Sequence, residues 1–506
     1  MKKIHFFNRI LKCFIILGLI VLSQCLHAYK YKQHKEDRPN RIIFLLSDDH
    51  RYDYMGFMDA VEWLETPNMD RLARNGAHCS EAFVTTALCS PSRATILTGL
   101  YTHEHTIVDN QAPNPGIHTY FPKHLQAAGY KTAFFGKWHM GDDSNASQPG
   151  FDHWESFKGQ GVYYGPTLNI NGEEITYPKD VYTTDLLTQH AIEWLEQQDP
   201  DQPCFVYLSH KSVHAEFLPA KRHEGLYEGK KIKLPISYEQ TKNGEYKKLN
   251  WPEWVKEQRI SWHGVDYMYH KSIDLHEQVT DYCETLMGVD DSIGAMLDYL
   301  ESADQSDDSL FIYMGDNGFS WGEHGLIDKR HFYEESTRVP LLFYYPSVIE
   351  PGQVNQSLIL NTDIAPTILD YAHADIPSYY VGKSIKPSFN TEEVYQLRDT
   401  VFYEYYWEYD FPMTPTTFGV RDAQYKLIRY HGIWDRNEFY DLKNDPHELY
   451  NLIESSEHQE RIIAMTEALY TWLENTDGMH IPLKRTVKTR WGDYRHQNQY
   501  ERIPTG

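Results

Sequence analysis

Four short hydrophobic runs stand out between residues 41 and 315, and polar residues follow each of them at once. The runs fall within residues 41–47, 132–136, 205–209 and 310–315. Each has three to five consecutive apolar residues, which is typical of a strand that a parallel sheet buries on both faces. The pattern therefore predicts four strands of one buried sheet.

Amphipathic helical patterns lie between these runs, for example over residues 185–197 and 281–300. Alternating strands and helices predict an α/β fold, here a large mixed, mostly parallel sheet flanked by helices. Ligands of such sheets bind beyond the carboxyl ends of the strands. The polar residues that follow all four runs fall at that edge, so we expect the functional site there.

The pattern changes after about residue 387. Residues 401–409, 417–421 and 425–430 predict short antiparallel strands. Residues 457–475 predict an amphipathic helix, whose apolar stripe consists of Ile462, Met465, Leu469, Trp472 and Leu473. This texture predicts a smaller α+β subdomain that follows the α/β domain.

The chain begins with a targeting signal. Four basic residues precede the apolar segment 14–22, which is too short to span a bilayer comfortably, and a small-residue cleavage site ends at Ala28. We expect an exported protein, periplasmic or secreted, whose mature chain has no transmembrane segment. An alternative is that Cys25 carries a lipid that anchors the protein at the cell surface. The expected signal peptide, α/β domain and α+β subdomain span residues 1–28, 39–387 and 388–506.

The chain has 506 residues and a formal net charge of -24. A chain this acidic is not a general binder of nucleic acid, so a sulfated or phosphorylated partner needs a local positive site. Six cysteines are present, of which two lie in the signal peptide. The remaining four are too few for a disulfide framework.

Carboxylates gather at the ends of two predicted strands. Asp48 and Asp49 follow the first run, and Asp316 and Asn317 follow the fourth. Either pair alone is most simply a strand-end turn that caps a helix. Together at one edge, three carboxylates and an amide oxygen form a set suited to Ca²⁺ or Mg²⁺. The sequence therefore predicts a metal site.

The stretch LCSPSRATILTG contains a predicted helix start. Ser90 is a suitable N-cap, Pro91 a favoured first helical residue and Gly99 a helix end. Cys89 would then precede the amino terminus of the helix, where free N–H groups attract anions and lower a thiol pKa. No partner base for a cysteine nucleophile stands out, however, and a hard metal beside it prefers oxygen.

The segment Cys89–Arg93 closely resembles the signature of type I sulfatases, in which the cysteine of C-x-P-x-R is oxidised after translation to formylglycine (3-oxoalanine). Further segments that resemble the family are Ser47–His50, Thr66–Asp70, Gly136–His139, Gly315–Gly318, His324–Lys329, Tyr333–Pro340 and Glu438–Pro446. The resemblance covers about residues 40–453 and implies an alkaline phosphatase-like fold.

The resemblance also implies roles for single residues. The implied ligands of one Ca²⁺ are Asp48, Asp49, Cys89, Asp316 and Asn317. The implied catalytic residues are Cys89, Arg93, Lys137, His139, His214 and Lys329. The family usually has His-x-Pro where this chain has His214-Ala215-Glu216, so His210 competes with His214 for the role beside the sulfate.

The chemistry of sulfate ester hydrolysis fits these residues. The sulfate group is a compact anion, and its charge can be neutralised by Ca²⁺, Arg93, Lys137 and Lys329. A hydrated aldehyde carries two hydroxyls on one carbon: one attacks sulfur, and deprotonation of the other lets the hemiacetal collapse and expel sulfate. A plain serine or cysteine would remain a stable ester. His214 is our candidate for the acid that protonates the leaving oxygen.

We therefore expect an exported, Ca²⁺-dependent sulfatase that acts on a polysaccharide or its oligosaccharides, either algal, such as ulvan, or glycosaminoglycan. Its partners would be that sulfated carbohydrate and a formylglycine-generating enzyme that recognises the Cys89 motif. One alternative is a phosphodiesterase or phosphonate monoester hydrolase of the same superfamily. Another is a non-catalytic protein that binds sulfated glycans and keeps Cys89 unconverted.

Several residues are candidates for contact with the substrate. His103 and His105 follow the Cys89 helix, and Arg330 and His331 follow Lys329. For the first two, a pair of ordinary surface histidines is a nearly equal alternative. Asparagine and glycine at positions 169–172 predict a hairpin of structural use.

Residues 218–264 form a long polar segment. Between residues 221 and 260 it holds ten Lys and Arg against six Glu. Its interspersed aromatic residues are Tyr227, Tyr238, Tyr246, Trp251 and Trp254. The segment is either a solvated surface insertion or a wall on which sugar rings stack while lysines meet acidic groups.

Overall fold

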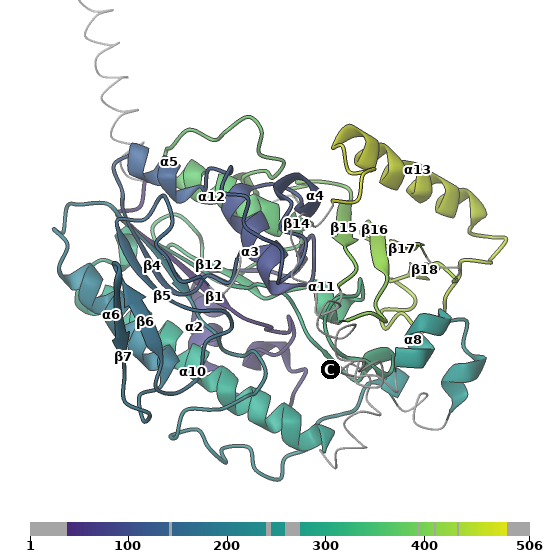
Figure 1. Cartoon of the computed structure of the whole chain (residues 1–506), viewed down its shortest axis with the longest axis horizontal. Helices are drawn as coiled ribbons and strands as arrows, with labels where there is room; N and C mark the ends of the chain where they lie inside the picture. The colour runs from purple at the N-terminus through teal and green to yellow at the C-terminus, as the bar shows by residue number, and fades with distance from the viewer. Residues whose placement is uncertain are drawn as a thin grey trace, which may run out of the picture.

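The computed structural model describes residues 38–140, 144–238, 244–258, 274–391, 395–408, 411–432 and 435–482 (Figure 1). The predicted signal peptide and Cys25 lie outside the described residues, as do parts of the polar segment and of the C-terminal subdomain. Among the described residues we find no helix that is a candidate for a membrane span.

A ten-stranded sheet forms the centre of the molecule, in the order β13-β2-β12-β9-β1-β8-β4-β5-β6-β7. Its strands are β1 Arg41–Ser47, β2 Ala77–Cys79, β4 Lys131–Lys137, β5 His153–Phe157, β6 Thr167–Ile170, β7 Glu173–Thr176, β8 Cys204–Ser209, β9 Ser309–Gly315, β12 Leu341–Tyr344 and β13 Gln353–Asn355. Two-stranded pairs are formed by β3 Ala82–Phe83 with β14 Ile359–Leu360, and by β10 Ser320–Trp321 with β11 Ile327–Asp328.

Five neighbouring strands, β9, β1, β8, β4 and β5, run parallel to one another. Four of them are the strands predicted from the hydrophobic runs, and they lie side by side. Antiparallel pairing of β12 with β9 and of β6 with β5 makes the sheet mixed, so the predicted α/β architecture is confirmed. The hairpin of β6 and β7 is also as predicted.

Alternate residues of β1 divide between two hydrophobic cores, one on each face of the sheet. Ile42, Phe44 and Leu46 belong to one core, whereas Ile43 and Leu45 belong to the other. This division is why the run has no polar member: both faces of the strand are covered.

Helices cover both faces of the sheet (Figure 1). α3, α5 and α12 contribute to the first core, and α2, α6 and α10 to the second. The helices are α2 Pro67–Asn75, α3 Cys89–Thr98, α4 Thr102–His105, α5 Pro122–Ala127, α6 Thr183–Glu196, α8 Glu253–Gln258, α10 Leu275–Ser302, α11 Glu334–Thr337, α12 Ile364–Tyr371 and α13 Gln459–Asn475. Short 3-10 helices are η1 Gly56–Met58, η2 Glu245–Lys248, η3 Ser306–Asp308, η4 Glu323–Gly325, η5 Asn361–Asp363 and η6 Lys386–Ser388.

A four-stranded antiparallel sheet follows the large sheet in the chain, in the order β15-β16-β17-β18. Its strands are β15 Val401–Tyr405, β16 Thr416–Arg421, β17 Tyr425–His431 and β18 Glu438–Asp441. Three of them correspond to predicted strands, and β18 was not predicted as one. Helix α13 packs on this sheet through the predicted stripe, all five members of which are buried.

Candidate active site

Asp48 and Asp49 meet Asp316 and Asn317 at the carboxyl edge of the large sheet. β1 and β9 are in register at their ends, which places the two pairs side by side. The Asp49 amide donates a hydrogen bond to Asp316 Oδ1 (3.0 Å), and Asn317 Nδ2 donates to Asp49 Oδ1 (2.7 Å). All four residues are buried, so the structure brings together the predicted metal ligands of both strands.

These four side chains fit a hard divalent cation. Carboxylate oxygens of Asp48, Asp49 and Asp316 lie within 4.8 Å of one another. Asn317 Oδ1 is buried and accepts no hydrogen bond from the described residues, which is costly for an amide oxygen unless a ligand takes it up. An oxygen-only donor set is the kind that Ca²⁺ and Mg²⁺ take.

Burial and neighbouring charges act differently on the carboxylates. Burial raises the pKa of Asp49 to about 7 although Lys329 opposes it, and the charge of Asp48 adds repulsion. Burial also acts to raise the pKa of Asp48, but Lys137, His214 and Arg93 outweigh it and hold that pKa well below its usual value. Carboxylates this close require positive charge between or beside them.

Arg93, on the first turns of α3, supplies one of the positive charges. Its Nε and Nη2 lie 2.9 and 2.8 Å from Asp316 Oδ2, and Nη1 donates to the Lys137 carbonyl (2.7 Å) and to Ser209 Oγ (2.6 Å). The guanidinium is 1% exposed. Arg93 thus joins α3 to the ends of β9, β4 and β8.

Two lysines supply the remaining positive charges. Lys137 Nζ donates to Asp48 Oδ2, and Lys329 Nζ donates to Asp49 Oδ1 and, over 3.3 Å, to Cys89 Sγ. Both side chains are buried. Three cations therefore stand against the three carboxylates around Cys89.

Cys89 is the first residue of α3. Leu88 is the N-cap, and the Ser90 hydroxyl instead donates to the His139 carbonyl, so the predicted cap at Ser90 is wrong. Gly99 ends the helix with a φ of 67°, as predicted, because glycine adopts this left-handed conformation without steric cost.

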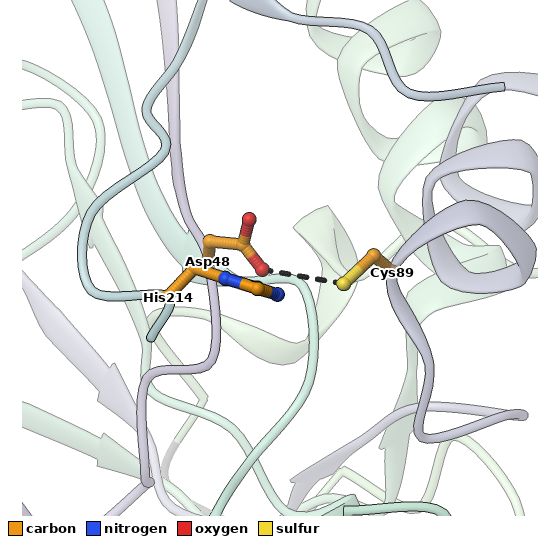
Figure 2. A group of neighbouring side chains, drawn as sticks. All are labelled: Asp48, Cys89 and His214. Carbon is orange, nitrogen blue, oxygen red and sulfur yellow. Dashed lines mark hydrogen bonds between the residues drawn. The ribbon is translucent and has the colours of Figure 1, made fainter. Parts of the chain in front are cut away.

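The thiol of Cys89 points at the acidic edge, where Asp48 and His214 face it (Figure 2). Its Sγ donates to Asp48 Oδ1 over 3.4 Å. Burial, and then the charge of Asp48, raise the pKa of Cys89 to about 12. The predicted lowering of this pKa is therefore wrong, because desolvation of the thiolate outweighs the helix terminus and the lysines. A thiol in this state is a poor nucleophile.

Of the two competing histidines, His214 is the one near Cys89. One ring nitrogen of His214, the Asp48 carboxylate and Cys89 Sγ all lie within 4.8 Å of one another, and His214 Nε2 is 3.9 Å from Asp49 Oδ2. His210 is instead fully buried, with Nε2 2.9 Å from Ser292 Oγ. Burial and the nearby Lys137 lower the pKa of His214 well below its usual value.

His139 also belongs to the cluster. Burial lowers its pKa well below the usual value, and the positive charges of Lys137 and Arg93 lower it further. Its buried Nδ1 has no hydrogen-bond partner among the described residues. The imidazole is therefore neutral.

The structure does not support His105 as a substrate contact. Its side chain is fully buried, Nε2 lies 3.1 Å from Thr95 Oγ1, and Nδ1 accepts from the Ile107 amide. His105 therefore links α4 to α3 and stabilises the turn that follows α4. Arg330 and His331 are each 4% exposed, so their predicted contact with substrate stays a prediction.

Arg330 is held by neighbours of opposite charge. Its Nε donates to Glu408 (2.7 Å), Nη1 bonds Asp328, and the guanidinium lies 3.4 Å from the centre of the Phe411 ring. The ring of His331 lies tilted against that of Tyr333, with ring centres 5.4 Å apart. Arg330 therefore connects the active-site edge with the C-terminal subdomain.

His103 clamps the two parts of the chain together. Its Nδ1 lies 2.8 Å from Glu404 Oε2 and its Nε2 3.0 Å from the Thr476 carbonyl oxygen. Both partners are acceptors, so both nitrogens carry protons and the ring is an imidazolium. Burial would lower the pKa of His103, but Glu404 outweighs it and the pKa is raised. These contacts give His103 a structural role.

We expect the contribution of His103 to stability to depend on pH. Because its folded pKa lies above the unfolded value of about 6.5, the contribution is complete below pH 6.5 and is lost as pH rises through the folded pKa. His103→Gln should cost about 1.5–3 kcal/mol at pH 5.5 and less at pH 9. Urea unfolding of both proteins at the two pH values measures this, and an equal cost at both would contradict it.

Four of the aromatic residues proposed for a sugar-binding wall are buried in the structure. Trp251, Trp254, Tyr227 and Tyr238 are all buried, and the Trp251 indole donates to the Leu449 carbonyl (3.1 Å). That functional prediction is therefore wrong for these four residues. They anchor the segment in the two hydrophobic cores, while Lys230, Lys231 and other lysines lie on the surface.

Sequence reasoning missed two polar residues that touch the cluster. Ser209, at the end of β8, receives a hydrogen bond from Arg93 (2.6 Å) and donates to the Lys137 carbonyl (2.8 Å). Gln160 accepts from Lys137 Nζ (2.5 Å). Ser209 ends a predicted strand, which is a usable signal, whereas Gln160 lies in a loop and only its flanking glycines mark it.

The chain is similar to known proteins over most of its length. The sulfatase family model matches residues 40–374, and the model of the N-sulphoglucosamine sulphohydrolase C-terminal region matches residues 322–475. An N-acetylglucosamine-6-O-sulfatase of Bacteroides thetaiotaomicron is 33% identical over 504 aligned residues, covering 88% of each chain.

Solved structures share the fold. A protein in complex with its substrate, D-glucosamine-2-N,6-O-disulfate, superposes with a TM-score of 0.80 at 30% identity, over 88% of this chain and all of the other. A phosphonate monoester hydrolase of Agrobacterium radiobacter, at 21% identity, gives 0.70 over 87% of this chain and 96% of the other. This second likeness shows the alkaline phosphatase-like fold alone. The chain belongs to the sulfatase family and is a sulfuric ester hydrolase.

Proposed function

We propose that this protein is an exported, Ca²⁺-dependent sulfatase that removes 6-O-sulfate from glucosamine-type units of glycosaminoglycans, through a formylglycine made from Cys89. The observation that carries the proposal is the placement of Cys89: its sulfur touches Asp48 and Lys329, at an edge where three cations surround three carboxylates. Two similar proteins support the substrate class: the N-acetylglucosamine-6-O-sulfatase at 33% identity, and the protein at 30% identity whose substrate is D-glucosamine-2-N,6-O-disulfate.

The residues present divide the work of hydrolysis among them. Asp48, Asp49, Asp316 and Asn317 would hold the metal, together with the oxygen that replaces the Cys89 sulfur. When bound, Ca²⁺ would supply positive charge to the sulfate oxygens and to the nucleophile. Lys137 and Lys329 add charge against the sulfate group, and Arg93 holds the ligand Asp316 in place.

Proton transfer falls to the two histidines. One hydroxyl of the hydrated formylglycine would attack sulfur and release its proton, while the sugar oxygen leaves with a proton that we assign to His214. The released proton replaces the one that His214 gives, so the step balances. We assign to His139 the proton of the other hydroxyl. The hemiacetal then collapses, sulfate departs and the aldehyde is restored. Burial and the lysine charges disfavour a protonated His214, and the negative charge of the bound sulfate ester would oppose both effects.

A panel of sulfated sugars tests the substrate. We expect sulfate release from N-acetylglucosamine 6-O-sulfate and glucosamine-2-N,6-O-disulfate, and none from N-sulfoglucosamine or sulfated ulvan oligosaccharides. Ion chromatography of sulfate, with NMR to locate the cleaved ester, gives the answer. The C-terminal family match makes the N-sulfate an alternative substrate group. Sulfate release from N-sulfoglucosamine, or from ulvan oligosaccharides alone, would contradict the proposal.

Phosphonate ester hydrolysis remains the second enzymatic candidate because the fold is shared with such a hydrolase. Rates on an aryl sulfate and an aryl phosphonate monoester separate the two. Export rests on the signal peptide predicted over residues 1–28, and amino-terminal sequencing of protein taken from the host would test cleavage after Ala28 and lipidation of Cys25.

A further inference from the structure

The ammonium group of Lys137 has two acceptors. Nζ donates to Asp48 Oδ2 and to Gln160 Oε1, the latter over 2.5 Å. A lysine ammonium is a point charge on a flexible stem, with three protons and no fixed direction. Two acceptors fix its orientation and leave one proton for a third partner. Gln160 therefore determines where Lys137 presents its remaining proton.

A glycine-flanked turn presents Gln160 to the site. Gly159 and Gly161 have φ values of 54° and 67°, a region that glycine adopts at little cost. A Cβ at Gly161 would lie 2.4 Å from the Phe157 ring, so the turn closes tightly on the strand it follows. Because Phe157 pairs with Lys137 in the parallel register of β5 and β4, this turn emerges directly beside Lys137.

The same segment also supports His214. The Tyr163 hydroxyl donates to the His214 carbonyl oxygen (2.5 Å), and Lys211 Nζ lies 4.7 Å from the centre of the Tyr163 ring. Residues 159–163 thus contact two members of the cluster, Lys137 through a side chain and His214 through its backbone. Contacts on both sides make this segment part of the active-site wall.

The chemical type of the acceptor matters as much as its position. Asp48 already pairs with Lys137, so a second carboxylate would overcompensate the lysine charge and repel an anion. An amide oxygen orients the ammonium and leaves its charge available to a sulfate group. Glutamine meets both requirements, because its carbonyl accepts hydrogen bonds and carries no net charge.

We propose that Gln160 is a positioning residue of this sulfatase, which acts through Lys137 to orient the ammonium group toward the sulfate of the substrate. The part of the inference that concerns reaction rates rests on the proposed formylglycine-dependent function. Binding of inorganic sulfate tests it without turnover.

Two substitutions separate orientation from charge. Gln160→Met keeps the length of the side chain and removes the acceptor, and we expect both kcat/KM and the affinity for inorganic sulfate to fall about tenfold or more, as for the loss of one charge-assisted hydrogen bond. Gln160→Glu keeps the acceptor and adds a negative charge. Here kcat should stay within about threefold of wild type while KM and the sulfate Kd rise about tenfold.

Gln202→Met is the matched control, because Gln202 lies at the opposite edge of the sheet and donates to the Gly129 carbonyl (2.9 Å). Calorimetric titration with sodium sulfate and initial rates on the ester that wild type cleaves are measured for all four proteins. If Gln160→Met and Gln160→Glu bind sulfate as wild type does, the inference is wrong. A different outcome would overturn the proposed function instead: the wild-type protein hydrolyses no sulfate ester, while the Gln160 variants still bind inorganic sulfate more weakly than wild type does.

Discussion

Cys89→Ala should abolish sulfate release, with a loss of roughly 10⁴-fold or more, because alanine cannot be converted to the oxygen nucleophile. The wall of the site should survive, since alanine only removes a sulfur that contacts Asp48 and Lys329. Ion chromatography of released sulfate measures the loss. Mass spectrometry of the tryptic peptide 75–93 of wild type should show the aldehyde in place of the thiol.

Cys204→Ala is the matched control. Cys204 is also a buried cysteine, but it lies at the first position of β8, at the opposite edge of the sheet. We expect activity within about twofold of wild type, because surface and scaffold changes away from the site leave the transition state untouched. Full activity of a wild-type protein that carries only the unmodified thiol would refute the formylglycine proposal.

Cys89→Ser separates the enzyme from a binding protein. A serine hydroxyl can attack sulfur, but it has no second hydroxyl with which to expel sulfate. Incubation with substrate should therefore yield one stable sulfate ester per chain and no further turnover, which intact-mass measurement detects. A non-catalytic glycan-binding protein would show no such adduct.

Removal of the metal should have the second-largest effect. We expect exhaustive chelation to lower activity about 100-fold or more, and added Ca²⁺ to restore it, because Asp48, Asp49 and Asp316 would otherwise repel one another and leave the sulfate charge unopposed. Saturation at 100 times Kd should stabilise the fold by about 3 kcal/mol. Thermal unfolding with and without Ca²⁺ measures this gain.

Asp316→Asn sharpens the metal test because it keeps the shape of the ligand and removes its charge. Calcium should then stabilise the protein less at the same concentration. Asp152→Asn, a carboxylate that accepts from the Thr132 amide at the start of β4, should respond to Ca²⁺ as wild type does. Elemental analysis should show that the chelated protein is free of metal. If its activity and melting temperature are then unchanged, the calcium proposal is wrong.

Much of the fold could be predicted because the chain alternates buried strands with amphipathic helices. Asp48 and Asp316 were identified together since both end strands whose hydrophobic runs are unmistakable, and parallel strands share an edge. Lys137 follows another such run directly. The sequence therefore predicts the position of a residue best where that residue lies at the end of a recognisable strand.

Residues carried by loops, and properties set by burial, could not be predicted in the same way. Gln160 lies in a turn whose path depends on Phe157, and Trp251 lies in an insertion whose packing partner, Leu449, is distant in sequence. The pKa of Cys89 was misjudged because the sequence shows the helix terminus but not the full burial of the thiol. Tertiary packing decided each of these cases.

The burial of α3 sets an order of events in the life of the chain. All ten residues of this helix, Cys89 included, are inaccessible in the folded protein. The enzyme that we propose oxidises Cys89 would therefore have to bind the segment while it is still unfolded. If Cys89 is converted as we propose, a chain that folds before the enzyme reaches it keeps its thiol and stays inactive. Unfolding such chains and refolding them in the presence of the modifying enzyme should then restore activity.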